Sequence, residues 1–294
     1  MKMTPIMAVN NSHYDDYDEC KVLGGHHFQT FDGNHYSYPI RGSYTLFQDC
    51  LSEMPQYYVY FNASYECIDP ATQSNCKISL TVTSGGRDYI FTPGANHALV
   101  SGQEVKIPFS QGILTTLRMG NYIFINGLDD VRIVYDNEKN IYVYAPITAK
   151  RKLCGLCGYY DGSRDNDYVD YSKKVIPKLS DFVKTWLDPN PKDVTIYPSV
   201  APHPCFALKT SNNTIYKSVL AQCQFLKQSL LGKSCQSLVD PQHYIEACQD
   251  DLCQCLKDNH DLEKCQSLVC NAASQYSYAC SRKGLAVNWR DGSD

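Results

Sequence analysis

The sequence lacks features on which several classes of protein depend. No apolar run approaches the roughly 18 residues needed to span a bilayer, so we expect no membrane insertion. Positive charge is not in excess either, because 27 Lys and Arg face 31 Asp and Glu, for a formal net charge of −4. Nucleic-acid binding depends on basic side chains that neutralise phosphates, so no nucleic-acid partner is expected.

Further absences concern secretion, zinc and catalysis. The chain opens Met-Lys-Met-Thr-Pro. No apolar stretch of roughly 7–15 residues follows, so no secretion signal is visible, and we expect a part of a longer chain. No paired Cys-x-x-Cys set completes a tetrahedral zinc site. Histidines such as His26, His27 and His35 have no Ser or Cys partner at a recognisable catalytic spacing, so we assign no catalytic residue.

Cysteine, in contrast, is abundant. Nine of the 15 cysteines fall between Cys205 and Cys280, a density typical of a disulfide scaffold made in an oxidising compartment. We therefore expect a secreted, extracellular glycoprotein, and the glycosylation sequons at Asn10, Asn62 and Asn212 agree with this location. Because 15 is odd, one cysteine must stay buried, be oxidised or pair with another molecule.

The hydrophobic pattern changes along the chain. Residues 1–19 are polar and acidic, which predicts a mobile arm. Between 20 and 187, apolar residues alternate with polar ones, as at Ile78, Leu80 and Val82, and glycines and prolines separate the runs at a spacing typical of an antiparallel β-sandwich. Residues 188–204 are rich in proline and predict an extended connector. Residues 205–294 show helical spacing, as at Tyr244, Cys248 and Leu252, which predicts a small helical domain.

Three segments carry a family resemblance. The first is Cys20-Lys-Val-Leu-Gly-Gly-His-His-Phe-Gln-Thr-Phe-Asp-Gly, which closes with Tyr44-Thr-Leu-Phe-Gln-Asp-Cys, and the second is Cys154-Gly-Leu-Cys-Gly-Tyr-Tyr-Asp-Gly-Ser-Arg-Asp-Asn-Asp. In this order they resemble the von Willebrand factor type D domain. The third, Val239-Asp-Pro-Gln-His-Tyr-Ile-Glu-Ala-Cys-Gln-Asp-Asp-Leu-Cys-Gln-Cys, resembles the eight-cysteine domain that follows type D domains in mucins, von Willebrand factor, tectorins and zonadhesin. The resemblance implies an all-β, antiparallel, sandwich-like domain followed by a small disulfide-rich α-helical domain.

The second segment has the composition of a calcium loop. Oxygen-bearing side chains cluster around a glycine between 161 and 167, as a cation that takes about six to eight oxygen ligands requires. The resemblance implies side-chain ligands from four residues and backbone carbonyl ligands nearby: Asp32, Asp161, Asn166 and Asp167, with the carbonyls near Ser163 and at Tyr159. Tyr159 stands where the family usually has Asn, which favours a weaker affinity. The alternative is a solvated acidic turn, because Asp-Gly and Asn-Asp are also common turn formers.

The resemblance also implies a disulfide pattern. The implied pairs are Cys20–Cys157, Cys50–Cys154, Cys67–Cys76, Cys205–Cys253, Cys223–Cys248 and Cys235–Cys280. Cys255, Cys265 and Cys270 then share one bridge, and Cys265 or Cys270 is the candidate for a bond between chains. The alternatives are a buried thiol and a bond to a module outside this sequence. The family cysteines expected near Gly42 and just after Trp186 are both absent.

These features favour a non-enzymatic function. We expect a calcium-stabilised structural, adhesion and assembly module of a larger matrix- or mucin-like glycoprotein, with other protein chains as partners in homo- or hetero-assembly and multimerisation. A binding module for a secreted ligand such as a growth factor is the alternative. A disulfide-exchange activity of the pair Cys154 and Cys157 is a third hypothesis, because Cys-x-x-Cys thiols at a helix N-terminus can exchange disulfides.

Overall fold

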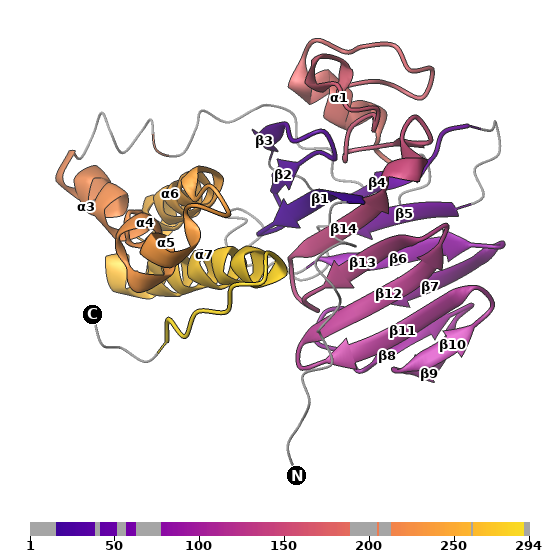
Figure 1. Cartoon of the computed structure of the whole chain (residues 1–294), viewed down its shortest axis with the longest axis horizontal. Coiled ribbons are helices and arrows are strands. Elements are labelled where there is room, and N and C mark those ends of the chain that lie inside the picture. Colours follow the sequence, from indigo (N-terminus) through magenta and orange to yellow (C-terminus); the bar gives the residue numbers. More distant parts are fainter. Residues whose placement is uncertain are drawn as a thin grey trace. The chain divides into compact units, whose positions relative to one another are not determined.

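The computed structural model describes residues 16–38, 42–51, 57–62, 78–188, 205, 213–259 and 261–290. The chain forms two compact units, whose described residues run from 16 to 188 and from 205 to 290 (Figure 1). Several predicted features lie outside the described residues: Asn10, Cys67, Cys76, Asn212 and nearly all of the connector 188–204. The third predicted glycosylation site, Asn62, is the last residue of a described strand.

The first unit consists of two antiparallel sheets. The eight-stranded sheet has the order β10 (Phe109–Gln111), β11 (Leu114–Met119), β12 (Tyr122–Leu128), β13 (Val131–Tyr135), β14 (Ile141–Pro146), β1 (Tyr17–Leu23), β2 (His27–Gln29) and β3 (His35–Ser37). The seven-stranded sheet has the order β15 (Leu153–Cys154), β4 (Ser43–Asp49), β5 (Tyr57–Asn62), β6 (Ser79–Ser84), β7 (Arg87–Phe91), β8 (His97–Val100) and β9 (Gln103–Lys106). Short helices η2 (Ile147–Ala149), η3 (Arg164–Asn166) and α1 (Leu179–Thr185) complete the unit.

Alternation of apolar side chains explains how the sheets pack. Leu80 and Val82 of β6, and Ile133 and Val143 of β13 and β14, are fully buried and belong to one core that draws on both sheets. Trp186, just after α1, is fully buried too, and its indole N–H donates to the Val169 carbonyl at 3.0 Å. The predicted antiparallel β fold is therefore confirmed, and its two sheets share a single hydrophobic core.

The predicted acidic arm is too long at its C-terminal end. Residues 17–19 begin strand β1, where Tyr17 lies opposite Pro146 and Glu19 lies opposite Tyr144 of β14. The Ile147 N–H also donates to the Asp16 carbonyl at 2.9 Å. The prediction was wrong here because these polar residues gain backbone partners from β14, which is remote in sequence and leaves no signal in the local composition.

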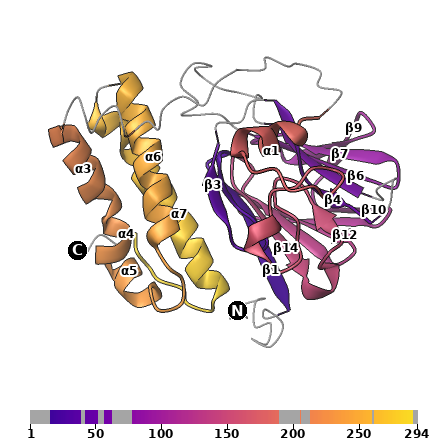
Figure 2. The same ribbon diagram turned by 90° about the horizontal axis from the view of Figure 1, so that it is seen from above.

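The second unit is helical, as predicted. It consists of α3 (Asn213–Cys223), α4 (Phe225–Gln228), α5 (Leu230–Cys235), α6 (Gln242–Asn259) and α7 (Leu262–Arg282). Tyr244 of α6 and Tyr276 of α7 are buried with ring centroids 5.2 Å apart, where these two long helices pack side by side (Figure 2). Helix α7 is capped by Asp261, the residue before it, whose carboxylate accepts the N–H of Glu263. Within the described parts of the chain, every helix is too short or too polar to cross a membrane.

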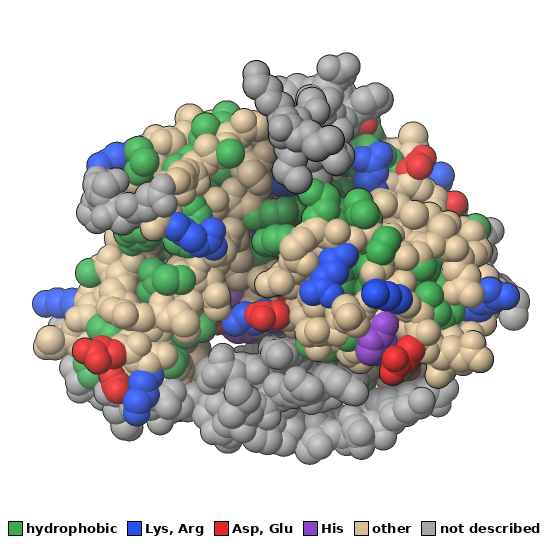
Figure 3. Space-filling model, turned by 90° about the horizontal axis from the view of Figure 1, so that it is seen from below, with side chains coloured by type: hydrophobic (Ala, Val, Ile, Leu, Met, Phe, Trp, Pro, Cys, Tyr) green, Lys and Arg blue, Asp and Glu red, His purple; other side chains and the backbone are tan. Residues whose placement is uncertain are grey.

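Charges on the surface are mixed in sign. On the face drawn in Figure 3, basic and acidic side chains lie among hydrophobic and polar ones rather than in one basic field. The mixture on this face agrees with the near balance of 27 basic and 31 acidic residues.

Candidate calcium site and disulfide framework

The loop after β15 is held between two distant parts of the first unit. The Cys157 N–H donates to the Leu46 carbonyl of β4 at 2.9 Å, and the Cys157 carbonyl accepts the Phe31 N–H at 3.0 Å. The segment that precedes residues 159–167 is therefore fixed on both sides. This arrangement brings Asp32, the neighbour of Phe31, to the acidic loop, as the calcium hypothesis requires.

The Asp32 carboxylate is tied to the backbone of the loop. Its two oxygens accept the N–H groups of Asp161 at 3.1 Å and Gly162 at 2.9 Å. Partial burial raises the pKa of Asp32, and the nearby charge of Asp161 adds to this, whereas the two backbone hydrogen bonds and the charge of Lys150 oppose it. The result is a carboxylate whose charge is incompletely compensated.

Asp161 organises the turn that follows it. One of its oxygens accepts the Ser163 N–H at 2.9 Å, and the other accepts the side-chain amide of Asn166 at 2.9 Å. The remaining Asn166 oxygen, Oδ1, is buried and has no hydrogen-bond partner. The amide N–H is thus used by Asp161, whereas the amide oxygen is left without a partner.

Asp167 is the most buried acidic residue of the loop, with 1% of its surface exposed. Its Oδ2 accepts the hydroxyl of Thr30 at 2.7 Å, whereas its Oδ1 is buried without a partner. Burial raises the pKa of Asp167 to about 7; the side chains of Thr30 and Asn34 oppose this shift by hydrogen bonding, and the charges of Asp32 and Asp161 reinforce it. The negative charges of Asp32 and Asp161 therefore act on the Asp167 carboxylate, which is almost removed from water.

A glycine makes room for this carboxylate. Gly158 has a φ of +82°, and a Cβ at this position would lie 2.3 Å from Asp167 Oδ1. A side chain here would have to displace the carboxylate, and an L-residue would also be strained at this φ. Gly158 and Thr30 both shape the site, although neither belongs to the predicted ligand set.

The donor set fits a hard divalent cation. Three carboxylates, the side-chain oxygen of Asn166 and several loop carbonyls are the ligand types that calcium prefers, and Asn166 Oδ1 and Asp167 Oδ1 are buried without partners. Buried oxygens without a hydrogen-bond partner lower the stability of the folded chain, and a bound cation would remove this loss of stability. Tyr159 contributes its N–H to the Asp167 carbonyl at 3.0 Å, and its ring lies 5.5 Å from the ammonium of Lys173.

Two disulfides anchor the ends of this region. The structure forms Cys20–Cys157 and Cys50–Cys154, with sequence separations of 137 and 104 residues. Cys154 and Cys157 are fully buried and belong to different bridges, so they are not joined to each other as a redox-active Cys-x-x-Cys pair would be. This arrangement argues against the disulfide-exchange hypothesis.

The absent family cysteines correspond to neighbouring positions in this chain. A Cβ at Gly42 would lie 3.8 Å from a terminal carbon of Leu187, the residue after Trp186. Tyr44, two residues after Gly42, forms an isolated β-bridge with Leu187. Gly42 and Leu187 therefore lie close together at the two places where the resemblance implies a bridge in relatives.

The helical unit carries four further bridges. They are Cys205–Cys253, Cys223–Cys248, Cys235–Cys280 and Cys255–Cys265. The proposal of Cys265 as the unpaired residue is wrong, because its buried side chain is bonded to Cys255. Cys270 lies five residues further along α7, about 140° around the helix, and is an exposed free cysteine.

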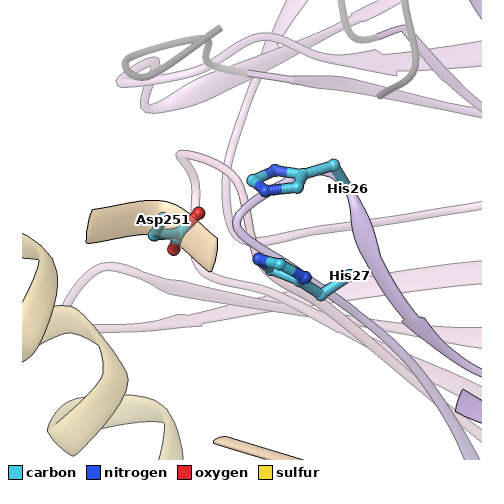
Figure 4. A group of neighbouring side chains, drawn as sticks. All are labelled: His26, His27 and Asp251. Carbon is cyan, nitrogen blue, oxygen red and sulfur yellow. The ribbon is translucent and has the colours of Figure 1, made fainter. Parts of the chain in front are cut away.

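The histidines at the turn from β1 to β2 have structural partners. His26 Nδ1 contacts the Gly24 carbonyl at 3.0 Å, and His27 Nδ1 contacts the Ser37 hydroxyl at 2.8 Å. Ser37 lies opposite His27 in the β2–β3 register, so a serine partner exists that the sequence spacing did not reveal. Figure 4 shows the two histidine rings, with centroids 4.0 Å apart, and labels Asp251 of α6, which belongs to the second unit.

The first unit holds a carboxylate-rich loop between two long-range disulfides, and the second unit is helical and rich in disulfides. This combination defines an extracellular class of protein. Residues 20–174 match the model of the von Willebrand factor type D domain, and residues 222–294 match that of the C8 domain. The chain belongs to the von Willebrand factor type D family, and the resemblance drawn from the three sequence segments is confirmed.

Its relatives are large proteins. The chain is 28% identical to otogelin-like protein of Mus musculus over 275 residues, which is 92% of this chain and 11% of the relative. It is 28% identical to mucin-2 of Homo sapiens, covering 92% of this chain and 5% of the relative. It is also 28% identical to von Willebrand factor of Bos taurus, covering 95% of this chain and 28% of the relative. The chain thus spans about a tenth of the length of its otogelin-like relative. These relatives and the disulfides place the chain outside the cell.

Proposed function

We propose that this chain is a calcium-stabilised structural and assembly module of a larger secreted, matrix- or mucin-like glycoprotein. The observation that carries the proposal is the buried Asp167 carboxylate, which has one oxygen without a partner beside two further carboxylates. The two long-range disulfides that hold this loop support a rigid spacer role.

Calcium would act here by neutralising charge and fixing the loop. Asp32, Asp161, Asn166 and Asp167 would hold the ion through side-chain oxygens, with carbonyl oxygens from Tyr159 and Ser163. When bound, the ion would supply two positive charges that join the loop to Asp32, in the turn between β2 and β3. The chain's own contribution is to orient the ligands: Thr30 holds one Asp167 oxygen and the backbone of the loop holds Asp32.

Calcium titration of the folded chain tests the proposal. We expect calorimetry to detect one binding event, and we expect calcium to raise the melting temperature above that in a chelator. Asp161→Asn should weaken binding at least tenfold, because a ligand charge is lost while the amide keeps a similar shape. Asp130→Asn, in an exposed turn between β12 and β13, is the matched control and should bind like the wild type. A wild-type chain that binds no calcium at millimolar concentration would refute the calcium component.

An exposed apolar patch favours a second function, the binding of a secreted protein ligand. Leu117 and Met119 of β11 are 48% and 42% exposed, and they lie opposite Phe124 and Tyr122 of β12. Exposed apolar clusters on a sheet often contact other proteins. Surface plasmon resonance against purified growth factors tests this alternative: Leu117→Asp should abolish any binding, whereas Leu51→Asp, at another exposed position, should not.

A further inference from the structure

A lysine ammonium lies against the proposed calcium loop. Lys150 Nζ is 3.4 Å from Asp18 Oδ2 and 5.6 Å from the centroid of the Tyr160 ring. The same nitrogen is 3.6 Å from the position that a Cβ would take at Gly162. Because the Gly162 N–H donates to Asp32, the lysine charge lies beside the backbone group that binds a proposed calcium ligand.

Contacts from three segments fix the position of this lysine. Lys150 follows η2, and its N–H donates to the Ile147 carbonyl at 3.2 Å. Asp18, on β1, accepts the Tyr160 hydroxyl at 2.8 Å on the same Oδ2 that contacts the lysine. Tyr160 belongs to the loop segment itself and is fully buried. Asp18 therefore connects the first strand to the lysine and to the acidic loop.

We propose that Lys150, held by Asp18, is a built-in counter-cation that lowers the calcium affinity of the loop. The inference rests on the proposed calcium function and extends it to regulation. Without calcium, the ammonium offsets part of the negative charge around Asp32. With calcium bound, the ammonium and the ion repel each other, and Asp18 offsets part of that repulsion.

Partial exposure limits the size of this effect. The side chains of Lys150 and Asp18 are 37% and 42% exposed, so water and salt screen their charges. A modest decrease in affinity would keep the site responsive in the range typical of extracellular modules, about 10⁻⁴ to 10⁻³ M. Ion occupancy would then follow the calcium concentration around the protein instead of being permanent.

Three single variants of the full chain test the inference by calcium calorimetry. Lys150→Gln should bind calcium about three- to tenfold more tightly, because a nearby positive charge is lost. Asp18→Asn should bind about threefold more weakly, since it removes a negative charge but keeps an oxygen that accepts the Tyr160 hydroxyl. Lys106→Gln is the matched control: it changes the net charge equally, on β9 at the opposite edge of the sheet from β15, and should bind like the wild type.

Thermal unfolding separates this role from a purely structural one. In a chelator, Lys150→Gln should melt at a lower temperature than the wild type, because the carboxylates lose their counter-cation. In calcium, its melting temperature should rise by more than that of the wild type. A structural role alone would lower both melting temperatures and leave the calcium-induced rise unchanged. The difference in affinity should also shrink at 1 M salt.

The outcomes distinguish the two levels of the proposal. A wild type that binds calcium while Lys150→Gln binds with equal affinity would overturn the counter-cation role and leave the calcium function intact. A wild type that binds no calcium would overturn both. Tighter binding by Lys150→Gln together with weaker binding by Asp18→Asn would support the inference, because the two losses of charge act with opposite sign.

Discussion

At the scale of single residues, composition predicted the members of the acidic loop but not their environments. The oxygen-bearing side chains between 161 and 167 stand out in the sequence. The environment of Asp167 depends on Thr30, which approaches from the turn after β2, and on the space that Gly158 leaves for its carboxylate. A motif of seven residues contains no information about such neighbours, so the pKa of Asp167 was beyond prediction.

Asp167 leads to a prediction about pH. Its folded pKa is about 7, above the ordinary value of 3.8, so the folded chain binds more protons than the unfolded chain between these values. Stability without calcium should therefore fall as the pH rises from about 4 to 7, as far as this group contributes. Chemical denaturation in a chelator at several pH values measures this slope, and Asp167→Asn should flatten it. An unchanged slope in the variant would assign the dependence to other groups.

At the scale of elements, the alternation of apolar and polar residues was enough to locate strands along the chain but not to predict which strands pair. The runs around Leu80 and Val131 read directly as half-buried strands, and both are strands in the structure. The start of β1 was missed because its partner, β14, lies more than a hundred residues away along the chain. Long-range pairing of this kind determines where Asp18 lies, and thereby where Lys150 is held.

The disulfides of the two units should differ in their effect on stability. Replacing both cysteines of Cys50–Cys154, separated by 104 residues, should cost roughly 5 kcal/mol in the chain-entropy model. Replacing both cysteines of Cys255–Cys265, separated by 10 residues, should cost only about 3 kcal/mol by the same reasoning. Denaturant titrations of the two serine double variants measure both values. Equal losses of unfolding free energy in the two variants would show that strain or residual structure, not loop length, determines the effect of a disulfide.

At the scale of the whole chain, the odd cysteine links fold to assembly. Counting cysteines predicted one without an internal partner, and the family resemblance made Cys265 or Cys270 the candidate for a bond between chains. The helix geometry of α7 then decides between them, because Cys265 is buried and bonded whereas Cys270 is exposed. Which of the two cysteines is bonded depends on the side of α7 that each occupies and on the position of Cys255. A count of cysteines carries neither kind of information.

Covalent assembly through Cys270 is testable with secreted protein. We expect non-reducing electrophoresis to show a reducible dimer that Cys270→Ser abolishes, because an exposed thiol in an oxidising medium pairs with another. Ser267→Cys, which places a thiol at an exposed position about one turn before Cys270 in the Cys270→Ser background, should restore a dimer if exposure alone suffices. A wild type that is monomeric, with Cys270 readily alkylated, would contradict assembly through this residue.

The position of the Cys154–Cys157 segment also has a consequence for biosynthesis. Cys20 and Cys50 emerge from the ribosome long before their partners, which follow 137 and 104 residues later. At a synthesis rate of about 5–20 residues per second, both thiols wait on the order of ten seconds without a native partner. During that interval they are free to bond to each other. Correct oxidation of this module therefore depends on whether the two nascent thiols stay reduced for that time, or on later reshuffling of any bridge formed between them.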